Sequence, residues 1–333
     1  MNSAAISQGY LAARERAGLV TRTRGLIVVS GQDRASYLQG LLTNDIAALR
    51  AGTGCYAAYL TAQGRMVSDL HVYELGDVIL LALPGATTAA VLAKLDQFIF
   101  SEDVQLGDVS DALASVVVVG PDAARILAPL VGAELAELAG LPGHGNLRRV
   151  VDGQTLIVLR VADTGEPGYG LIAGRDQMPE LMQALRTAGA VDVDADTAEV
   201  LRVEAGLPLF GRDMDEDTIP LEAGIEQEAI SFTKGCYVGQ EVIIRVMHRG
   251  HGRVARRLVG LVLGEDDPLP PPGTTLHSAD REVGVVTSSV LSPVLGCPIA
   301  LGYVKRDVLE SGASLLTSHG AVIRVAPLPF RTA

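Results

Sequence analysis

The chain has 333 residues, of which 48% are hydrophobic and 20% are charged, and its formal net charge is −12. This composition excludes an intrinsically disordered chain, and the length suggests two or three domains. The acidic balance argues against a protein that binds nucleic acid through bulk charge. The longest apolar stretch, residues 78–93, is interrupted by Pro84 and Gly85, so we expect no membrane span and no membrane partner.

The cysteine pattern and the N-terminal region indicate a reducing compartment. Cys55, Cys236 and Cys297 are far apart and form no Cys-x-x-Cys pair, so we predict neither a disulfide framework nor a cysteine-based zinc site. His248 and His251 are close in sequence but have no neighbouring carboxylate ligand, so we predict no metal site there. The N-terminal region has no apolar run typical of a signal peptide, and we expect a cytoplasmic protein.

The first half of the chain repeats one order of elements. Residues 26–30 (LIVVS) predict a strand, and a turn at Gly31 and an apolar helix follow. Residues 116–130 (VVVVGPDAARILAPL) repeat that order with Gly120 in place of Gly31. Further strands and helices are expected at residues 71–83, 87–99, 154–162, 169–173 and 177–188. The repetition predicts two related α+β halves within about the first 190 residues.

The second half changes character twice. A predicted helix at residues 194–205 leads into an acidic segment, and residues 242–264 then contain five arginines and no acid. Short apolar strands at residues 253–264 and 282–290 are separated by a proline-rich turn. Short strands with Gly and Pro between them are typical of a small all-β module, which predicts a barrel that begins near Gly250.

The segment FTKGCYVGQE at residues 232–241 is the most unusual part of the chain. Gly235 and Gly239 allow backbone conformations and close approaches that other residues do not, and Lys234 stands two residues before Cys236. A helix that begins shortly afterwards would favour a thiolate at Cys236 through its dipole. The motif predicts either a reactive, partly exposed thiol or a tight turn around a small buried cysteine.

The basic segment that follows this motif has three possible roles. Its arginines would offset the preceding acidic run, which we rank first, or bind the carboxylates or phosphates of a small ligand, or bind RNA. Aromatic residues, which single-stranded nucleic acid requires, are missing after Tyr237, so we expect no nucleic-acid partner. Arg245 is our candidate for the ligand contact.

Two acidic residues have the chemistry to hold a ligand with paired N–H groups. Glu204 lies in LRVEAGLPLFGRD, and Asp69 lies in TAQGRMVSDLHVY. A carboxylate accepts two parallel N–H bonds from an amino-pyrimidinone edge, as it does from a guanidinium group. The alternative is that Glu204 is an exposed helical residue and Asp69 an ordinary acid near the start of a strand.

Five segments together resemble the YgfZ-type folate-binding proteins, which are relatives of the glycine-cleavage T-protein (aminomethyltransferase). They are GQDRASYLQGLLTNDI (31–46), YLTAQGRMVSDLHVY (59–73), LRVEAGLPLFGRDMDEDTIPLEAG (201–224), FTKGCYVGQE (232–241) and GVVTSSVLSPVLGCPIALGYV (284–304). The resemblance covers nearly the whole chain. KGCYVGQE is its specific string, because the T-protein branch lacks this cysteine, whereas the other strings are shared across the superfamily.

The resemblance implies an α+β fold in which two intertwined, duplicated α+β lobes form a folate-binding domain, followed by a small C-terminal β-barrel. We place the folate-binding domain at residues 1–249, with halves of roughly 1–110 and 111–249, and the barrel at 250–333. Tetrahydrofolate, or a one-carbon derivative of it, is expected in a central channel.

The resemblance also implies the site residues. We expect Cys236, Lys234 and Asp69 to be catalytic, with Asp69 near the reactive face of the folate and Cys236 as the functional signature. Glu204 is expected at the pterin edge. The residues expected to contact the folate are Glu204, Tyr237, Gln240, Glu241 and Arg245.

Three functions are consistent with this resemblance. The first is a tetrahydrofolate-binding accessory factor that supports assembly or repair of iron–sulfur clusters, with iron–sulfur client proteins or assembly factors as partners. The second is an enzyme, an aminomethyltransferase or related folate-dependent one-carbon transferase, although Ser68 stands where the T-protein has a second Asp before Asp69. The third is a tRNA-modification factor, for which residues 245–257 are the only local support. We expect a monomer.

Overall fold

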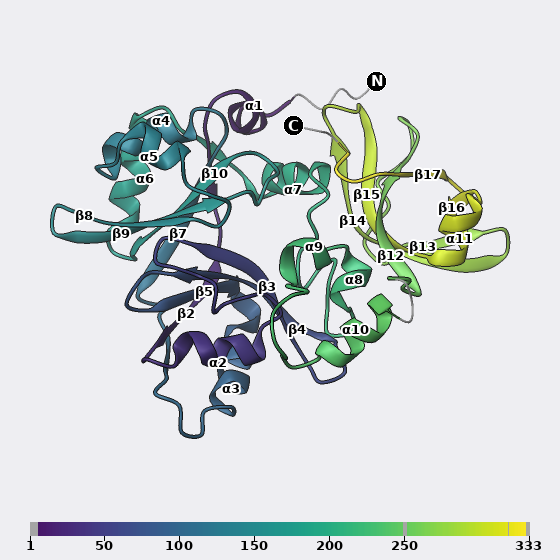
Figure 1. The fold of residues 1–333 in the computed structure, drawn as a ribbon. Coiled ribbons are helices and arrows are strands. Elements are labelled where there is room, and N and C mark those ends of the chain that lie inside the picture. The colour runs from purple at the N-terminus through teal and green to yellow at the C-terminus, as the bar shows by residue number, and fades with distance from the viewer. Residues whose placement is uncertain (1–5, 249–251, 319, 331–333) are drawn as a thin grey trace.

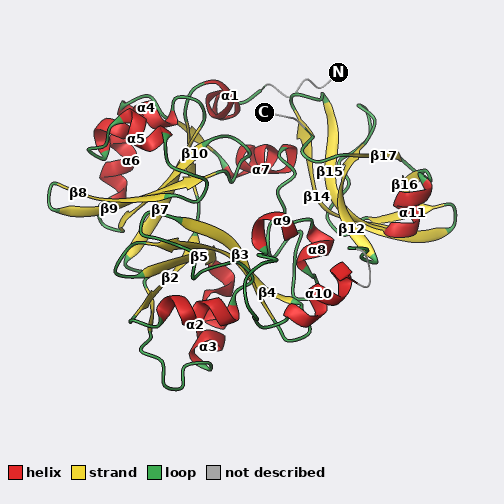
Figure 2. Cartoon of the chain, in the orientation of Figure 1, coloured by secondary structure: helices red, strands yellow, loops and turns green. Residues whose placement is uncertain are grey.

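The computed structural model describes residues 6–248, 252–318 and 320–330. Its strands form two open sheets and one closed barrel, and helices lie on the outer faces of the sheets (Figures 1 and 2). The predicted α+β fold with a C-terminal barrel is confirmed. Within the described ranges, no helix is long and apolar enough to cross a membrane. The proposed domain boundary near residue 250 falls outside the described residues and stays a prediction.

The first sheet is antiparallel and has the strand order β3-β4-β5-β2-β6. Its strands are β2 (Arg24–Ser30), β3 (Gly54–Leu60), β4 (Met66–Glu74), β5 (Ile79–Pro84) and β6 (Gln105–Asp108). Its helices are α2 (Arg34–Leu41), η1 (Gly85–Thr87) and α3 (Thr88–Asp96). Leu38 of α2 and Val91 and Leu95 of α3 are fully buried against one face of this sheet.

The second sheet has the order β11-β1-β7-β10-β9-β8. Its strands are β1 (Gly18–Thr21), β7 (Leu113–Val119), β8 (Asn146–Val151), β9 (Gln154–Val161), β10 (Gly168–Gly174) and β11 (Val191–Val193). Its helices are α1 (Gln8–Glu15), α4 (Ala123–Leu130), α5 (Leu135–Ala139) and α6 (Met178–Thr187). Leu127 of α4 and Leu185 of α6 are buried against one face.

The two sheets share one topology, which confirms the predicted duplication. Strands β3, β4, β5, β2 and β6 of the first sheet correspond in order to β8, β9, β10, β7 and β11 of the second. The difference is β1, which is inserted between β7 and β11 and thereby intertwines the two lobes. Gly31 and Gly120 occupy equivalent turns at φ of 100° and 110°, in the region that favours glycine.

Both faces of each sheet are buried, and strand alternation divides their side chains between two cores. In β7, Val116 and Val118 pack against the helices, whereas Val117 and Val119 pack against the other sheet. The leucines of β5 divide in the same way. Because both faces are covered, these strands read as continuous apolar runs in the sequence.

The C-terminal part forms a closed six-stranded barrel in the order β12-β15-β14-β13-β16-β17. Its elements are β12 (Arg256–Val262), β13 (Thr275–Ser278), β14 (Arg281–Ser292), β15 (Cys297–Lys305), α11 (Arg306–Ser311), β16 (Leu315–Thr317) and β17 (Val322–Ala326). Cys297 is buried at the start of β15, and Cys55 is partly buried in β3. Both have the packing role expected of them.

Helix α7 (Ala195–Glu204) joins the second lobe to the barrel through a buried ionic network (Figure 1). Arg202, only 3% exposed, donates from Nη1 to Asp213 Oδ2 at 2.7 Å and from Nη2 to Ser288 Oγ of β14 at 2.8 Å. The same guanidinium pairs with Glu199. Further along, the short helices α8 (Pro220–Ala223), α9 (Glu226–Ala229) and α10 (Gln240–His248) share an apolar cluster with β3 and β4.

We expect Arg202→Met to lower the free energy of unfolding by about 3–5 kcal/mol, because it leaves the buried Asp213 carboxylate without its cation. The measurement is urea-induced unfolding followed by circular dichroism. Arg212→Met is the matched control, because Arg212 pairs with the same Glu199 but its side chain is 48% exposed. We expect the control to cost less than about 1 kcal/mol. Equal costs for both variants would contradict a special role for the buried network.

Candidate functional site

The apolar interface between the two sheets ends in a polar region around Asp69 of β4. Side chains alternate along a strand, so Asp69, His71 and Tyr73 share the face that is turned toward the second sheet. Ser68 faces the opposite way and bonds Thr87 of η1, with 2.9 Å between the two hydroxyl oxygens. The same hydroxyl lies 2.9 Å from the Asp69 carbonyl oxygen, so Ser68 contacts the backbone of Asp69 and not its carboxylate.

The two carboxylate oxygens of Asp69 differ in their hydrogen bonding. The Tyr56 hydroxyl donates to Asp69 Oδ2 at 2.8 Å, whereas Oδ1 is buried and has no hydrogen-bond partner among the described residues. Burial raises the pKa of Asp69, while the Tyr56 hydrogen bond and the charge of Arg24 act in the other direction. Ala58 stands directly across the strand pair from Asp69, so the neighbouring side chain is small. A buried carboxylate oxygen without a partner points to a missing donor.

His71 and His144 were not singled out in the sequence, and they lie beside Asp69. Their Nδ1 atoms are 3.4 Å apart, and the His71 ring lies 5.1 Å from the Tyr56 ring, centroid to centroid. Burial, reinforced by Arg24, lowers the pKa of His71 to about 3, and burial also lowers the pKa of His144. Both rings are therefore neutral at pH 7. The i, i+2 spacing of Asp69 and His71 was the one available signal.

Asp163, in the loop after β9, brings two arginines to the same region. Arg24 Nη2 lies 2.5 Å from Asp163 Oδ2, and Arg22 Nη1 lies 3.4 Å from the same oxygen. Burial opposes ionisation of Asp163, but the two guanidinium groups outweigh it and hold the pKa of that carboxyl well below its usual range. No motif in the sequence marked these three residues.

Glu204 is only 1% exposed, at the C-terminal end of α7, and both of its oxygens are occupied. Ser292 of β14 donates to Oε1 at 2.5 Å, and Tyr10 of α1 donates to Oε2 at 2.8 Å. Arg14 of α1 also donates to Oε2. Glu204 is thus not an exposed helical residue; it ties α1, α7 and the barrel together. A pterin contact at Glu204 stays a prediction.

The contacts of Lys234 are structural, and its predicted catalytic role stays a prediction. Its ammonium group donates to the carbonyl oxygens of Gln39, Leu42 and Asn44 at 2.6, 2.7 and 2.8 Å. All three protons are therefore used at the C-terminal end of α2, where helix carbonyls lack internal partners. Burial lowers the pKa of Lys234 to about 8. We assign Lys234 to anchoring the motif loop, and the described contacts include no bond from it to Cys236.

The rest of the motif divides between the interior and the surface. Cys236 is exposed, which fits the partly exposed thiol rather than the buried one. Tyr237 is 7% exposed and belongs to the same apolar cluster as Tyr56, the residue that holds Asp69. Gln240 is half-buried at the start of α10, and Glu241 and Arg245 are exposed on that helix. The described contacts join none of these three side chains to the region around Asp69.

The basic segment offsets the acidic one, as the first interpretation predicted. Arg256 pairs with Glu222 at 3.2 Å, and Arg257 pairs with Glu226 at 3.3 Å. Arg249 and His251 lie outside the described residues. Among the residues that the structure describes, no three or more His, Cys, Asp or Glu side chains are grouped so that they could hold a metal ion.

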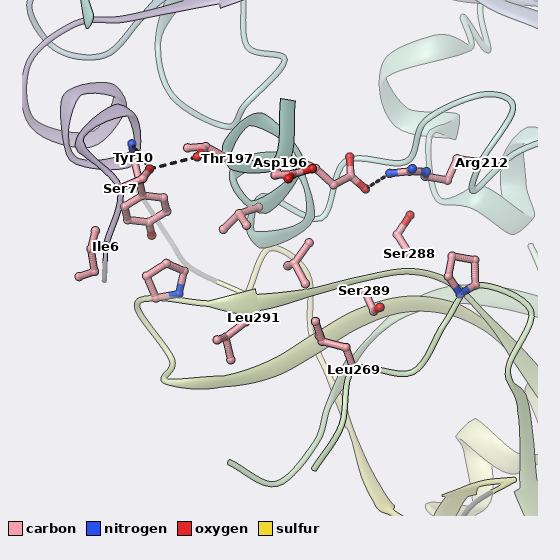
Figure 3. A pocket seen from close by; sticks show the side chains of 15 residues that line it. Ile6, Ser7, Tyr10, Asp196, Thr197, Arg212, Leu269, Ser288, Ser289 and Leu291 are labelled. Atoms are coloured by element: carbon pink, nitrogen blue, oxygen red, sulfur yellow. Dashed lines mark hydrogen bonds and ion pairs between the residues drawn. The ribbon is translucent and has the colours of Figure 1, made fainter. Parts of the chain in front are cut away.

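A cavity of about 530 Å³ lies elsewhere, between α1, α7 and β14 (Figure 3). Val200, Leu269 and Leu291 line it, and the ion pair of Glu199 and Arg212, at 2.6 Å, lies along one side. Among the described residues that line it, none is a predicted catalytic or folate-binding residue. The cavity is separate from the polar region around Asp69.

Comparison with known proteins covers almost the entire chain. The family model described as "GCVT N-terminal domain" matches residues 2–234, and the one described as "Glycine cleavage T-protein C-terminal barrel domain" matches residues 256–330. The aminomethyltransferase of Rubrobacter xylanophilus is 33% identical across 98% of this chain and 86% of its own length. The aminomethyltransferase of Geobacillus kaustophilus is also 33% identical, across 98% of this chain and 90% of its own length.

A solved structure shows the same fold. The crystal structure of glycine cleavage system aminomethyltransferase T from Bartonella henselae superimposes with a TM-score of 0.86. It covers 98% of this chain and 89% of that chain, at 24% sequence identity. The likeness therefore extends through both lobes and the barrel.

We expect Lys234→Met to lower the free energy of unfolding by about 3 kcal/mol, because three carbonyl oxygens at the end of α2 lose a charged donor. The measurement is urea-induced unfolding of the full chain. Lys305→Met is the control, because Lys305 is exposed and makes one such bond, to Glu282 O at 2.9 Å. We expect the control to cost less than about 1 kcal/mol. A loss for Lys234→Met no larger than the control's would contradict the anchoring role.

Proposed function

The chain belongs to the glycine cleavage T-protein family, and from this premise we propose that it is a tetrahydrofolate-dependent aminomethyltransferase or a related one-carbon transferase. The observation that supports the proposal concerns Asp69, which lies beside the interface of the two duplicated lobes. Its Oδ1 atom has no hydrogen-bond partner among the described residues, whereas Tyr56 fixes its Oδ2 atom. The two relatives described above are both named aminomethyltransferase. This chain matches 86% of the length of one and 90% of the length of the other. They support this function better than the accessory function, and they give no support to tRNA modification.

The residues around Asp69 fit a folate. When bound, tetrahydrofolate supplies ring N–H groups and the nitrogens that carry the one-carbon unit. Asp69 Oδ1 accepts such an N–H, because it is buried and lacks a donor in the described chain. The residue opposite is the small Ala58, and the aromatic rings of Tyr56 and His71 lie beside the carboxylate, with 5.1 Å between their centroids.

Three features of the chain prepare Asp69 for proton transfer. The Tyr56 hydroxyl fixes Oδ2, so that Oδ1 alone is free to accept or return a proton. The apolar interface between the sheets excludes water from one side and raises the pKa of Asp69 toward the range useful for acid–base chemistry. Arg24 opposes that rise and keeps the ionised form accessible. Asp69 is thus positioned to hold the proton that moves when a one-carbon unit is transferred.

The exposed Cys236 favours a second candidate, the accessory factor for iron–sulfur proteins. The thiol lies in KGCYVGQE, which is specific to the YgfZ-type resemblance, and Lys234 anchors the loop that presents it. A solvent-exposed thiol in an anchored loop can react with a sulfur or cluster intermediate of another protein. The accessory function requires the Cys236 thiol, whereas the aminomethyltransferase function does not use it. Substitution of Cys236 therefore distinguishes the two candidates.

We expect Asp69→Asn to lower kcat for methylene-tetrahydrofolate formation by about 100-fold or more, because the amide cannot take or return the proton. The assay uses an aminomethyl-lipoyl carrier protein as donor. Ser68→Ala is the control, because its side chain faces η1, and we expect its rate to remain within about twofold of wild type. Full activity of Asp69→Asn would remove Asp69 from the mechanism. Failure of the wild-type protein to turn over with a competent carrier would contradict the proposed enzyme itself.

We expect the accessory function, if present, to depend on Cys236. A deletion strain that carries wild-type protein or Cys297→Ala should regain aconitase activity in extracts, because Cys297 is buried in the barrel. The same strain with Cys236→Ser should not regain it. Normal rescue by Cys236→Ser, or a deletion strain without an aconitase defect, would exclude this function for that client.

A further inference from the structure

Arg22, Arg24 and Asp163 form a cluster in which two guanidinium groups share one carboxylate. Arg24 Nη2 and Arg22 Nη1 both point to Asp163 Oδ2, at 2.5 and 3.4 Å. Arg22 Nη2 makes one further bond, to the Asp163 carbonyl oxygen at 3.2 Å. The charges of these three side chains sum to plus one, and Arg24 also acts on the nearby carboxyl of Asp69, whose pKa it lowers.

The two arginines also have donors to spare. An arginine carries five N–H groups, and within the described residues Arg24 uses only its Nη2 group, while both bonds of Arg22 are long. Their side chains are 22% and 21% exposed, so the unused donors are accessible but largely removed from bulk water. Burial, together with the neighbouring Arg24, lowers the pKa of Arg22 in spite of Asp163. A desolvated cation with incomplete pairing is costly unless an anion binds to it.

The cluster is at the polar end of the interface between the sheets, on the Asp69 side. Arg24 begins β2, and Arg22 lies in the crossing from β1 to β2, where the chain passes from one sheet to the other. Arg24 lowers the pKa of both Asp69 and His71, which places it near both. The Ser115 hydroxyl of β7 donates to the Arg22 carbonyl oxygen at 3.2 Å and fixes the backbone there. The donors are therefore held in place before any ligand arrives.

We propose that Arg22 and Arg24 bind a carboxylate of the substrate beside Asp69, an inference that rests on the proposed folate-dependent function. The planar fork of arginine suits a carboxylate, with two parallel N–H bonds. Two sources supply this chemistry: the glutamate tail of the folate and a free amino acid. The cluster is a second candidate for the carboxylate contact beside Arg245, which stays a prediction.

Calorimetric titration of the full chain tests the proposal with three probes. Tetrahydrofolate carries the glutamate tail, tetrahydropteroate lacks it, and glycine is a free amino acid. The test variant is Arg22→Gln, which removes the cation with the weaker bonds and leaves the close Arg24–Asp163 pair intact. Arg281→Gln is the matched control, because the Arg281 side chain is 57% exposed on the barrel, where it pairs with Asp307 at 2.7 Å. Urea-induced unfolding confirms that both variants are folded.

If the folate tail is the source, Arg22→Gln weakens tetrahydrofolate binding about tenfold or more and leaves tetrahydropteroate binding unchanged. If an amino acid is the source, Arg22→Gln weakens glycine binding by a similar factor and leaves both folates unchanged. Equal loss of both folates, or no loss with any probe that wild type binds, overturns the proposal. If the wild-type protein binds neither folate, the proposed folate-dependent function is overturned as well. This outcome differs from one in which wild type binds folate and only the carboxylate site fails.

Discussion

The packing of two duplicated sheets face to face is the constraint on which the rest of the structure depends. Each sheet is apolar on both faces, so one face is left for its own helices and the other must find a partner. The N-terminal strand β1 pairs within the second sheet, and the next strand, β2, belongs to the first sheet. The short segment between β1 and β2 therefore connects the two lobes at their interface. The polar region around Asp69 exists where this apolar contact ends. Its location follows from the duplication itself.

The barrel is attached by charge and hydrogen bonds rather than by apolar contact alone. Arg202 and Glu204, two residues apart on α7, each reach a serine of β14, and each is almost fully buried. Buried charges of this kind are costly unless every partner is present, so they specify one arrangement of barrel and lobes more than they add stability. Glu204, which has the right chemistry for a ligand, already accepts three side-chain hydrogen bonds from Tyr10, Arg14 and Ser292.

The sequence predicted what depends on local pattern. Hydrophobic periodicity indicated the repeat around Gly31 and Gly120, and Gly and Pro between short strands indicated the barrel. Neighbouring charge indicated the pairing of Arg256 and Arg257 with the acidic segment. It did not predict Arg22 with Asp163, because those residues are 141 positions apart and only the insertion of β1 brings them together. Spacing in sequence carries no signal for such a pair.

Lys234 shows a second kind of limit. Its position two residues from Cys236 suggested activation of the thiol, yet its three donors are drawn to carbonyl oxygens at the end of α2, where the helix leaves acceptors unpaired. The groups that bind the Lys234 ammonium are therefore backbone carbonyl oxygens. A sequence pattern does not show which carbonyl oxygens lack a partner in the fold.

The segment FTKGCYVGQE also contacts the candidate site. Tyr237 packs in the same cluster as Tyr56, and Tyr56 holds Asp69, so the motif supports the carboxylate from behind while Cys236 faces solvent. One loop thus contributes Tyr237 to the interior and leaves Cys236 exposed at the surface. A chain that needed only the interior contact would keep the tyrosine packing and have no physical reason to expose a cysteine. The exposed thiol is therefore the feature that aminomethyl transfer alone leaves unexplained.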